Sequence, residues 1–192
     1  MEKKSKIIIG VVAIILVVIV ASFLVLSNME KTLSTENVAV TLPGSYNVDG
    51  DFAATSGDIS VMFSPVEDSK DNQLKWLNTI KSKGKASGYE NATNKTINGF
   101  TVYEFAAHPS DLKNVSSDKT YSGTSSSWSA TWVTYPPYQP GELKYCDHYR
   151  LVAYIKGNTV TYLVFYTSNP NVDLYSPEIN DIVASVHDPR QS

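Results

Sequence analysis

Cys146 and His148 are the residues whose types and spacing most readily suggest chemistry. Two residues at i and i+2 of a strand share one face, so a thiol and an imidazole there could act as nucleophile and base, or as metal ligands. A working nucleophile also needs a thiolate, an oriented base and a shaped pocket, and the sequence shows only that the two residues are close. The simpler interpretation, which we favour, is a lone cysteine that fills a gap beside a surface histidine.

Other motifs of catalysis and of cofactor or metal binding do not occur in the sequence. It contains no Gly-rich phosphate loop, no Gly-x-Ser-x-Gly elbow and no His-Glu-x-x-His pattern. A single cysteine excludes a disulfide framework and a cysteine-based zinc site, and the acids from Asp49 to Asp71 lack the spacing of a calcium loop. His108, before Pro109, and His187, at the end of an expected helix, have local explanations. We therefore expect no cofactor, no metal site and no enzymatic activity.

An aromatic segment between His108 and Glu142 is the strongest candidate for recognition. It is a long Ser/Gly-rich insertion, and such loops in compact domains are usually functional or disordered. Its rings could form a rigid contact surface for a cell-wall glycan or an envelope protein: Trp128, Trp132, Tyr135 and Tyr138. The two tryptophans also keep the period of two of a strand, so both could instead cover one edge of the core. We favour the core and keep recognition as the alternative.

Three Asn-x-Ser/Thr sequons begin at Asn91, Asn94 and Asn114. A sequence so rich in Asn, Ser and Thr contains such a number by chance, so the number itself carries no information. All three fall in polar segments that we expect to be turns of an exported domain. A cell that has the enzymes could glycosylate them there.

The apolar run Ile7–Leu26 indicates on which side of a membrane the candidate residues above would lie. It carries no charge, and a helix of its 20 residues reaches about 30 Å, the thickness of the hydrocarbon layer. Lys3, Lys4 and Lys6 precede it, which places the N-terminus in the cytoplasm and the rest of the chain outside. A cleaved signal peptide is the alternative, but the apolar region of signal peptides is shorter, about 7 to 15 residues, and no clean Ala-x-Ala site follows. We predict an uncleaved single-pass signal anchor in the lipid bilayer of the cell membrane.

The remaining sequence has the composition of one globular domain. Its apolar content and a net charge of −3 for the whole chain argue against disorder. Beyond the first six residues there is no cluster of Lys and Arg, which excludes a nucleic-acid binder held by phosphate contacts. We divide the chain into a cytoplasmic tail (1–6), the anchor (7–26), a linker (27–37), an exported domain (38–187) and a C-terminal tail (188–192).

The exported domain is expected to be α+β, an antiparallel sheet with helices packed on it. Asn98-Gly99 and Gly157-Asn158 predict two-residue hairpin turns, and the second turn sets Lys156 opposite Thr159. One face of that long hairpin is apolar, while the face with Arg150 and Tyr154 is half polar and expected to be only partly covered. The expected elements are strands at 38–42 and 59–63, a helix from Ser69 or Asp71 to Lys83, hairpins at 93–106 and 149–167, and a helix from Ser176 to Val186.

This order of elements resembles the PsbP-like fold, an α/β/α sandwich of extrinsic, exported accessory proteins. The resemblance covers 38–186 as a succession of elements and carries over no binding residue. It implies an accessory or binding module without catalysis. The anchor, short stalk and polar domain also resemble small surface proteins of methanogenic archaea. We expect an envelope binding or accessory protein, with two alternatives: an extracytoplasmic enzyme that uses Cys146 and His148, or a subunit of a larger membrane complex.

Overall fold

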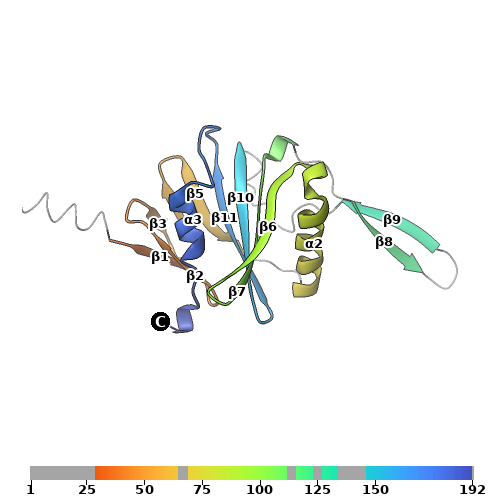
Figure 1. Ribbon diagram of the computed structural model, residues 1–192, viewed down its shortest axis with the longest axis horizontal. Coiled ribbons are helices and arrows are strands. Elements are labelled where there is room, and N and C mark those ends of the chain that lie inside the picture. Colours follow the sequence, from red (N-terminus) through yellow and green to blue (C-terminus); the bar gives the residue numbers. More distant parts are fainter. Residues whose placement is uncertain (1–28, 65–68, 112–115, 123–126, 134–145, 192) are drawn as a thin grey trace, which may run out of the picture.

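An open antiparallel sheet of seven strands forms the body of the protein (Figure 1). The computed structural model describes residues 29–64, 69–111, 116–122, 127–133 and 146–191. Strand order is β3-β4-β5-β11-β10-β7-β6. These strands span Asn47–Asp49 (β3), Ala53–Ser56 (β4), Ile59–Ser64 (β5), Tyr89–Ile97 (β6), Phe100–Ala107 (β7), His148–Lys156 (β10) and Thr159–Thr167 (β11). The expected α+β class with an antiparallel sheet is confirmed.

Both expected hairpin turns are present. Lys156 pairs with Thr159 around Gly157, whose φ is 58°, so the register of the long hairpin is as predicted. Asn98 and Gly99 turn between β6 and β7 with φ of 48° and 80°, the left-handed region that such turns need. The Asn98 amide also donates to the carbonyls of Ala184 and Val186, at 3.2 and 2.9 Å. This turn therefore holds the end of the last helix as well as its own strands.

Helix α2 (Lys70–Lys83) covers one face of the sheet. Ser69, one of the two expected starts, caps the helix, and the helix ends at Lys83 as expected, with Gly84 as its C-cap. Its buried side chains include Trp76, whose ring meets those of Phe105 and Tyr162 edge to face at centroid distances of 5.4 and 6.3 Å. These aromatic contacts fix the helix on β7 and β11.

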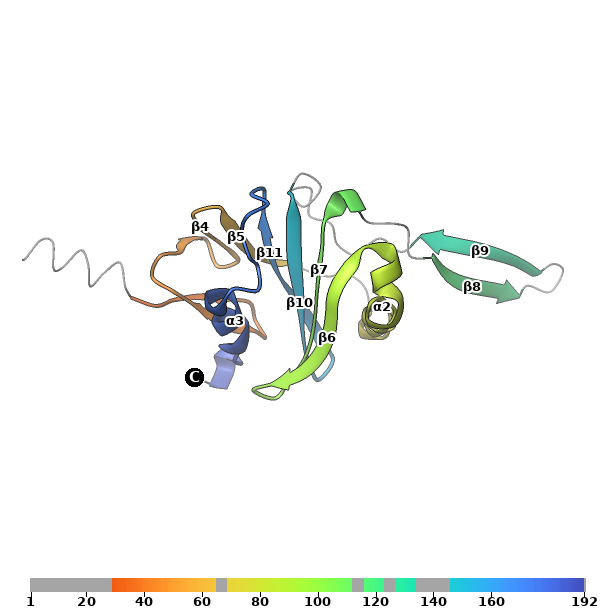
Figure 2. The same cartoon turned by 45° about the horizontal axis from the view of Figure 1, so that its top comes forward.

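The opposite face lies under helix α3 (Pro177–Ala184) and the hairpin of β1 (Lys31–Ser34) with β2 (Ala39–Leu42). Figure 2 shows α2 and α3 on either side of the central strands. Arg150 and Tyr154 are fully buried on the face covered by α3, so the expectation of a partly covered face was wrong. The Tyr154 hydroxyl on this face donates to the carbonyl of Val183 at 3.1 Å, within α3.

Strand β1 lies where we expected a linker, at 27–37. Leu33 is its one fully buried side chain, while Lys31, Thr32 and Ser34 are polar, so no apolar alternation marks the strand. The short strands β3 and β4 likewise lie between the strands expected at 38–42 and 59–63, in a segment for which no strand was expected. The folded domain therefore begins before Val38.

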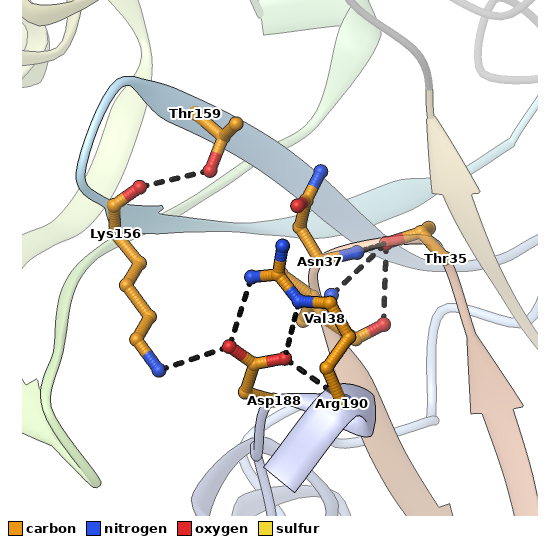
Figure 3. Close-up of polar contacts among 7 residues, drawn as sticks. All are labelled: Thr35, Asn37, Val38, Lys156, Thr159, Asp188 and Arg190. Carbon is orange, nitrogen blue, oxygen red and sulfur yellow. Dashed lines mark hydrogen bonds and ion pairs between the residues drawn. The ribbon is translucent and has the colours of Figure 1, made fainter.

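The C-terminal segment, which we expected to be a tail at 188–192, is held against the domain by side-chain and backbone contacts (Figure 3). His187 and Ala39 exchange two backbone hydrogen bonds, at 2.9 and 3.0 Å. The buried Asp188 carboxylate accepts from Lys156 at 3.2 Å and from Arg190 at 2.9 Å. These charges lower the pKa of Asp188, with the hydrogen bonds from Arg190 as the main cause. A short 3₁₀ helix, Pro189–Gln191, follows.

A separate two-stranded hairpin lies outside the seven-stranded sheet. Strands β8 (Ser116–Ser122) and β9 (Ser127–Val133) pair only with each other, and β9 confirms the strand expected around Trp128. The expected anchor, Ile7–Leu26, lies outside the described residues. Within the part of the chain that the structure describes, no helix combines the length and apolarity needed to cross a bilayer.

Candidate functional site

The end of β7 and the start of β10 bring two histidines together. Ala107 pairs with Tyr149, so the next positions along each strand, His108 and His148, lie side by side at one end of the sheet. Their ring centroids are 5.2 Å apart, with the planes inclined by 36°. Sequence separation hides this pair, because forty residues with an intervening hairpin stand between the two strands.

Asp147 lies between the two imidazoles. Its Oδ2 is 2.8 Å from His148 Nδ1 and 3.5 Å from His108 Nδ1. His108 Nδ1 also lies 3.2 Å from the backbone carbonyl oxygen of Asp147. The side chains of His108, Asp147 and His148 are 44%, 34% and 13% exposed, so the cluster is open on the His108 side and closed at His148.

The segment from Val172 to Tyr175 forms the wall behind His148. His148 Nε2 donates to the Val172 carbonyl at 2.8 Å, and Arg150 Nη1 donates to the Leu174 carbonyl at 3.0 Å. Two side chains on the same face of β10, His148 and Arg150, thus each donate a hydrogen bond to a backbone carbonyl of this segment. The Arg150 guanidinium also lies over the Tyr175 ring, 4.2 Å from its centroid.

Arg150 also belongs to an ion network with the buried Glu104 and the more exposed Lys95. Arg150 Nη2 donates to Glu104 Oε2, and Lys95 Nζ lies 2.9 Å from Glu104 Oε1. Burial by itself would raise the pKa of Glu104, but the hydrogen bonds and charges of Arg150 and Lys95 outweigh it and lower the pKa. Glu104 is therefore ionised at neutral pH and keeps Arg150 in place.

A cavity of about 120 Å³ opens beside the histidines. Besides His108, His148 and the Val172–Tyr175 segment, it is lined by Glu90 and Asn91 of β6. The pairing of β6 with β7 shifts register between Glu90 and Thr93, and Asn91 takes a φ of 52° in this bulge. The cavity has room for an ion with its waters or a group of a few atoms.

Cys146 does not share this opening. Its side chain belongs to the apolar cluster under α2. His148 instead faces the Val172–Tyr175 segment, whose Leu174 packs in the cluster on the α3 side. Cys146 precedes β10 rather than lying in it, so the strand rule that places i and i+2 on one face does not apply. Burial, and secondarily the Asp147 charge, raises the pKa of the thiol to about 11. The thiol is therefore protonated at neutral pH.

The structure describes only some of the other residues that the sequence suggested as candidates. Trp128 pairs with Tyr121 and Trp132 with Ser117 in the separate hairpin, whereas Tyr135 and Tyr138 lie outside the described residues. Recognition by these rings and their packing on the core both stay predictions. Asn91 and Asn94 occupy exposed positions of β6 rather than turns, and Asn114 lies outside the described residues. Their glycosylation likewise stays a prediction.

Two residues of this site were missed from the sequence: Asp147 was not considered, and His108 was given a local explanation. The signal of His108 was weak: it follows one expected strand, and His148 precedes another. Only the pairing of β7 with β10 makes these two positions neighbours, and pairing between distant strands cannot be derived from local periodicity.

No family model and no curated protein matches this sequence. Among solved structures, the chain is similar to the solution structure of cyanobacterial PsbP (CyanoP) from Synechocystis sp. PCC 6803. The sequence identity is 11% and the TM-score 0.41, over 84% of this chain and 93% of that chain. A likeness at this level concerns the course of the chain and carries no site residue. The resemblance to archaeal surface proteins stays a prediction.

Proposed function

We propose that this protein is a membrane-anchored, extracytoplasmic binding module of the cell envelope, without chemistry of its own. The observation that carries the binding role is the cluster of His108, Asp147 and His148, whose two histidines line one small cavity. The anchoring role is supported by the uncharged run Ile7–Leu26 and by the lysines that precede it.

The dimensions of the cavity favour binding over catalysis. About 120 Å³ accommodates an ion or a small polar group, far less than the roughly 300–1,000 Å³ of sites that enclose organic ligands. The alternative of an enzyme that uses Cys146 and His148 needs an accessible thiolate, and the Cys146 thiol is buried in the cluster under α2. The cavity therefore supports a module that holds something small.

Membrane residence is tested with the full-length chain in its producing cell. We expect the protein to stay in the membrane pellet after an alkaline carbonate wash. External protease should degrade the domain in intact cells. A protein that stays in the soluble fraction without detergent would refute the anchor, and a domain degraded only after cell lysis would refute its outward orientation.

A matched pair of variants tests whether the apolar run is what holds the protein in the membrane. Lysines at Ile14 and Val18 place two charges in the middle of the run, each at a cost of about 2.5–3.5 kcal/mol for insertion. We expect Ile14→Lys/Val18→Lys to lose membrane residence and Ile14→Leu/Val18→Leu to keep it. Equal distribution of the two variants would contradict the proposal.

A further inference from the structure

We propose that His108, Asp147 and His148 form a binding site for a divalent first-row transition-metal ion, with Zn²⁺ as the probe. The inference deepens the proposed function by naming the ligand of its cavity. It rests on the binding role of the cavity, not on the anchor.

The three donor atoms are close enough to share one ion. His108, Asp147 and His148 each offer one ligand atom, and these three atoms all lie within 4.8 Å of one another. Ligands at 2.0–2.1 Å from a tetrahedral Zn²⁺ are separated by about 3.3 Å. The 3.5 Å distance from His108 to the Asp147 carboxylate already matches, and the 2.8 Å distance from His148 needs to open by about half an ångström.

The second nitrogen of His148 is placed as in metal-binding histidines. Nε2 faces the Val172 carbonyl oxygen at 2.8 Å, so Nε2 carries a hydrogen and Nδ1 is the nitrogen turned to the cluster. Nδ1 in turn faces Asp147 Oδ2 at 2.8 Å. A metal ion placed between these two atoms would be bound by both groups, with the Val172 carbonyl still orienting the ring.

The backbone around the ligands is held by regular structure. The Asp147 N–H donates to the Thr167 carbonyl at 2.8 Å, which ties Asp147 to the end of β11. His108 follows β7 directly and accepts from the Asp111 N–H at 2.9 Å, within the turn begun by Pro109. Arg150 fixes the wall that supports His148. Ligands on such fixed positions lose little entropy when an ion binds.

The donor set selects the class of metal. Two imidazoles and one carboxylate suit zinc and its first-row neighbours, while Ca²⁺ and Mg²⁺ prefer sites built from oxygen ligands. The cavity leaves room for a fourth ligand, and Glu90 and Asp173 bring two more carboxylates to its lining. Water or one of these carboxylates can complete a tetrahedron.

The test is calorimetric titration of the full-length protein, purified in detergent and stripped with a chelator, with ZnCl₂. We expect one Zn²⁺ per chain and no heat of binding with CaCl₂. His108→Gln removes one ligand from the exposed side of the cluster and should weaken Zn²⁺ binding by about 100-fold or more, since loss of an outer-shell partner alone costs 10- to 100-fold. His187→Gln is the control, because His187 contacts the Ser185 carbonyl away from the cluster, and should bind as the unchanged protein does.

Two results would overturn the metal site: no Zn²⁺ binding by the unchanged protein, or equal binding by the His108→Gln and His187→Gln proteins. His148→Gln provides a second test, with its fold checked by circular dichroism because His148 also holds Val172. A protein that fails to bind Zn²⁺ but resides in the membrane would refute the metal and leave the anchored module. One that binds Zn²⁺ but is not membrane-bound would refute the anchor alone.

Discussion

Arg150 and Glu104 form an ion pair inside the protein, on neighbouring strands of the sheet face that α3 covers. Their side chains are only 1% and 8% exposed. Burying either charge alone would destabilise the fold, because only an opposite charge and further hydrogen bonds offset the free-energy cost of losing its hydration. Asn180 of α3 supplies one of these, as its Oδ1 accepts from Arg150 at 2.8 Å. The pair thus joins two strands, a helix and the wall of the histidine cluster.

Removing the Glu104 charge should destabilise the fold. We expect Glu104→Gln to lower the free energy of unfolding by about 3 kcal/mol, since it leaves the Arg150 guanidinium buried without its counter-charge. Urea denaturation followed by tryptophan fluorescence measures the loss. Glu30→Gln, at an exposed position, is the control, and an equal effect of the two substitutions would contradict this assignment.

The same pair should make stability depend on acidity. Arg150 and Lys95 lower the pKa of Glu104 below its ordinary value of 4.5. A carboxyl whose folded-state pKa is lowered contributes stability above its unfolded-state pKa and loses it as the pH falls through its folded-state pKa. Below about pH 4.5 we therefore expect the unchanged protein to lose stability more steeply than Glu104→Gln. Parallel curves from pH 6 to pH 3 would show that Glu104 does not supply this dependence.

Asp188 should hold the C-terminal segment against β2. Asp188→Asn removes the charge that binds Lys156 and Arg190, and we expect faster trimming by carboxypeptidase. Amide exchange at Ala39 should also accelerate, because its N–H donates to the His187 carbonyl. Asp49→Asn, on the exposed strand β3, provides the comparison. Unchanged exchange at Ala39 in the Asp188 variant would indicate that the backbone pairing alone holds this segment.

Cys146 should behave as a buried core residue. At 9% exposure, we expect slow reaction with a thiol reagent in the folded protein and complete reaction in denaturant. Cys146→Ala should keep the binding of Zn²⁺, since the thiol lies in the cluster under α2. Rapid labelling of the native protein, or loss of Zn²⁺ binding in the alanine variant, would contradict this assignment and support the alternative in which Cys146 and His148 act together.

Local signals were sufficient to predict much of this fold. Asn98-Gly99, Gly157-Asn158 and Ser176-Pro177 each determine backbone geometry within a few residues, and the hairpins and the capped helix appear where expected. Strand β1 escaped prediction because a single residue, Leu33, buries its side chain fully there. A strand of this kind is defined by its partner β2 and not by its own pattern.

The site was harder to predict than the fold. Cys146 and His148 drew attention because they are close in sequence, whereas the imidazole that lies beside His148 in space is that of His108. Their meeting depends on β7 lying beside β10, and strand order within a sheet is a property of the whole chain. The burial of Arg150 was missed for a related reason, because its partners Leu174 and Asn180 lie 24 and 30 residues away in the sequence.

The bulge in β6 also affects how copies of the protein meet. An open sheet ends in strands whose unpaired N–H and C=O groups can recruit another chain and start aggregation. Here one border strand is β6, interrupted at Asn91 and carrying exposed polar side chains such as Asn94 and Lys95. The opposite border, β3, is only three residues long. Both of these border strands therefore present poor templates for extension of the sheet by another copy.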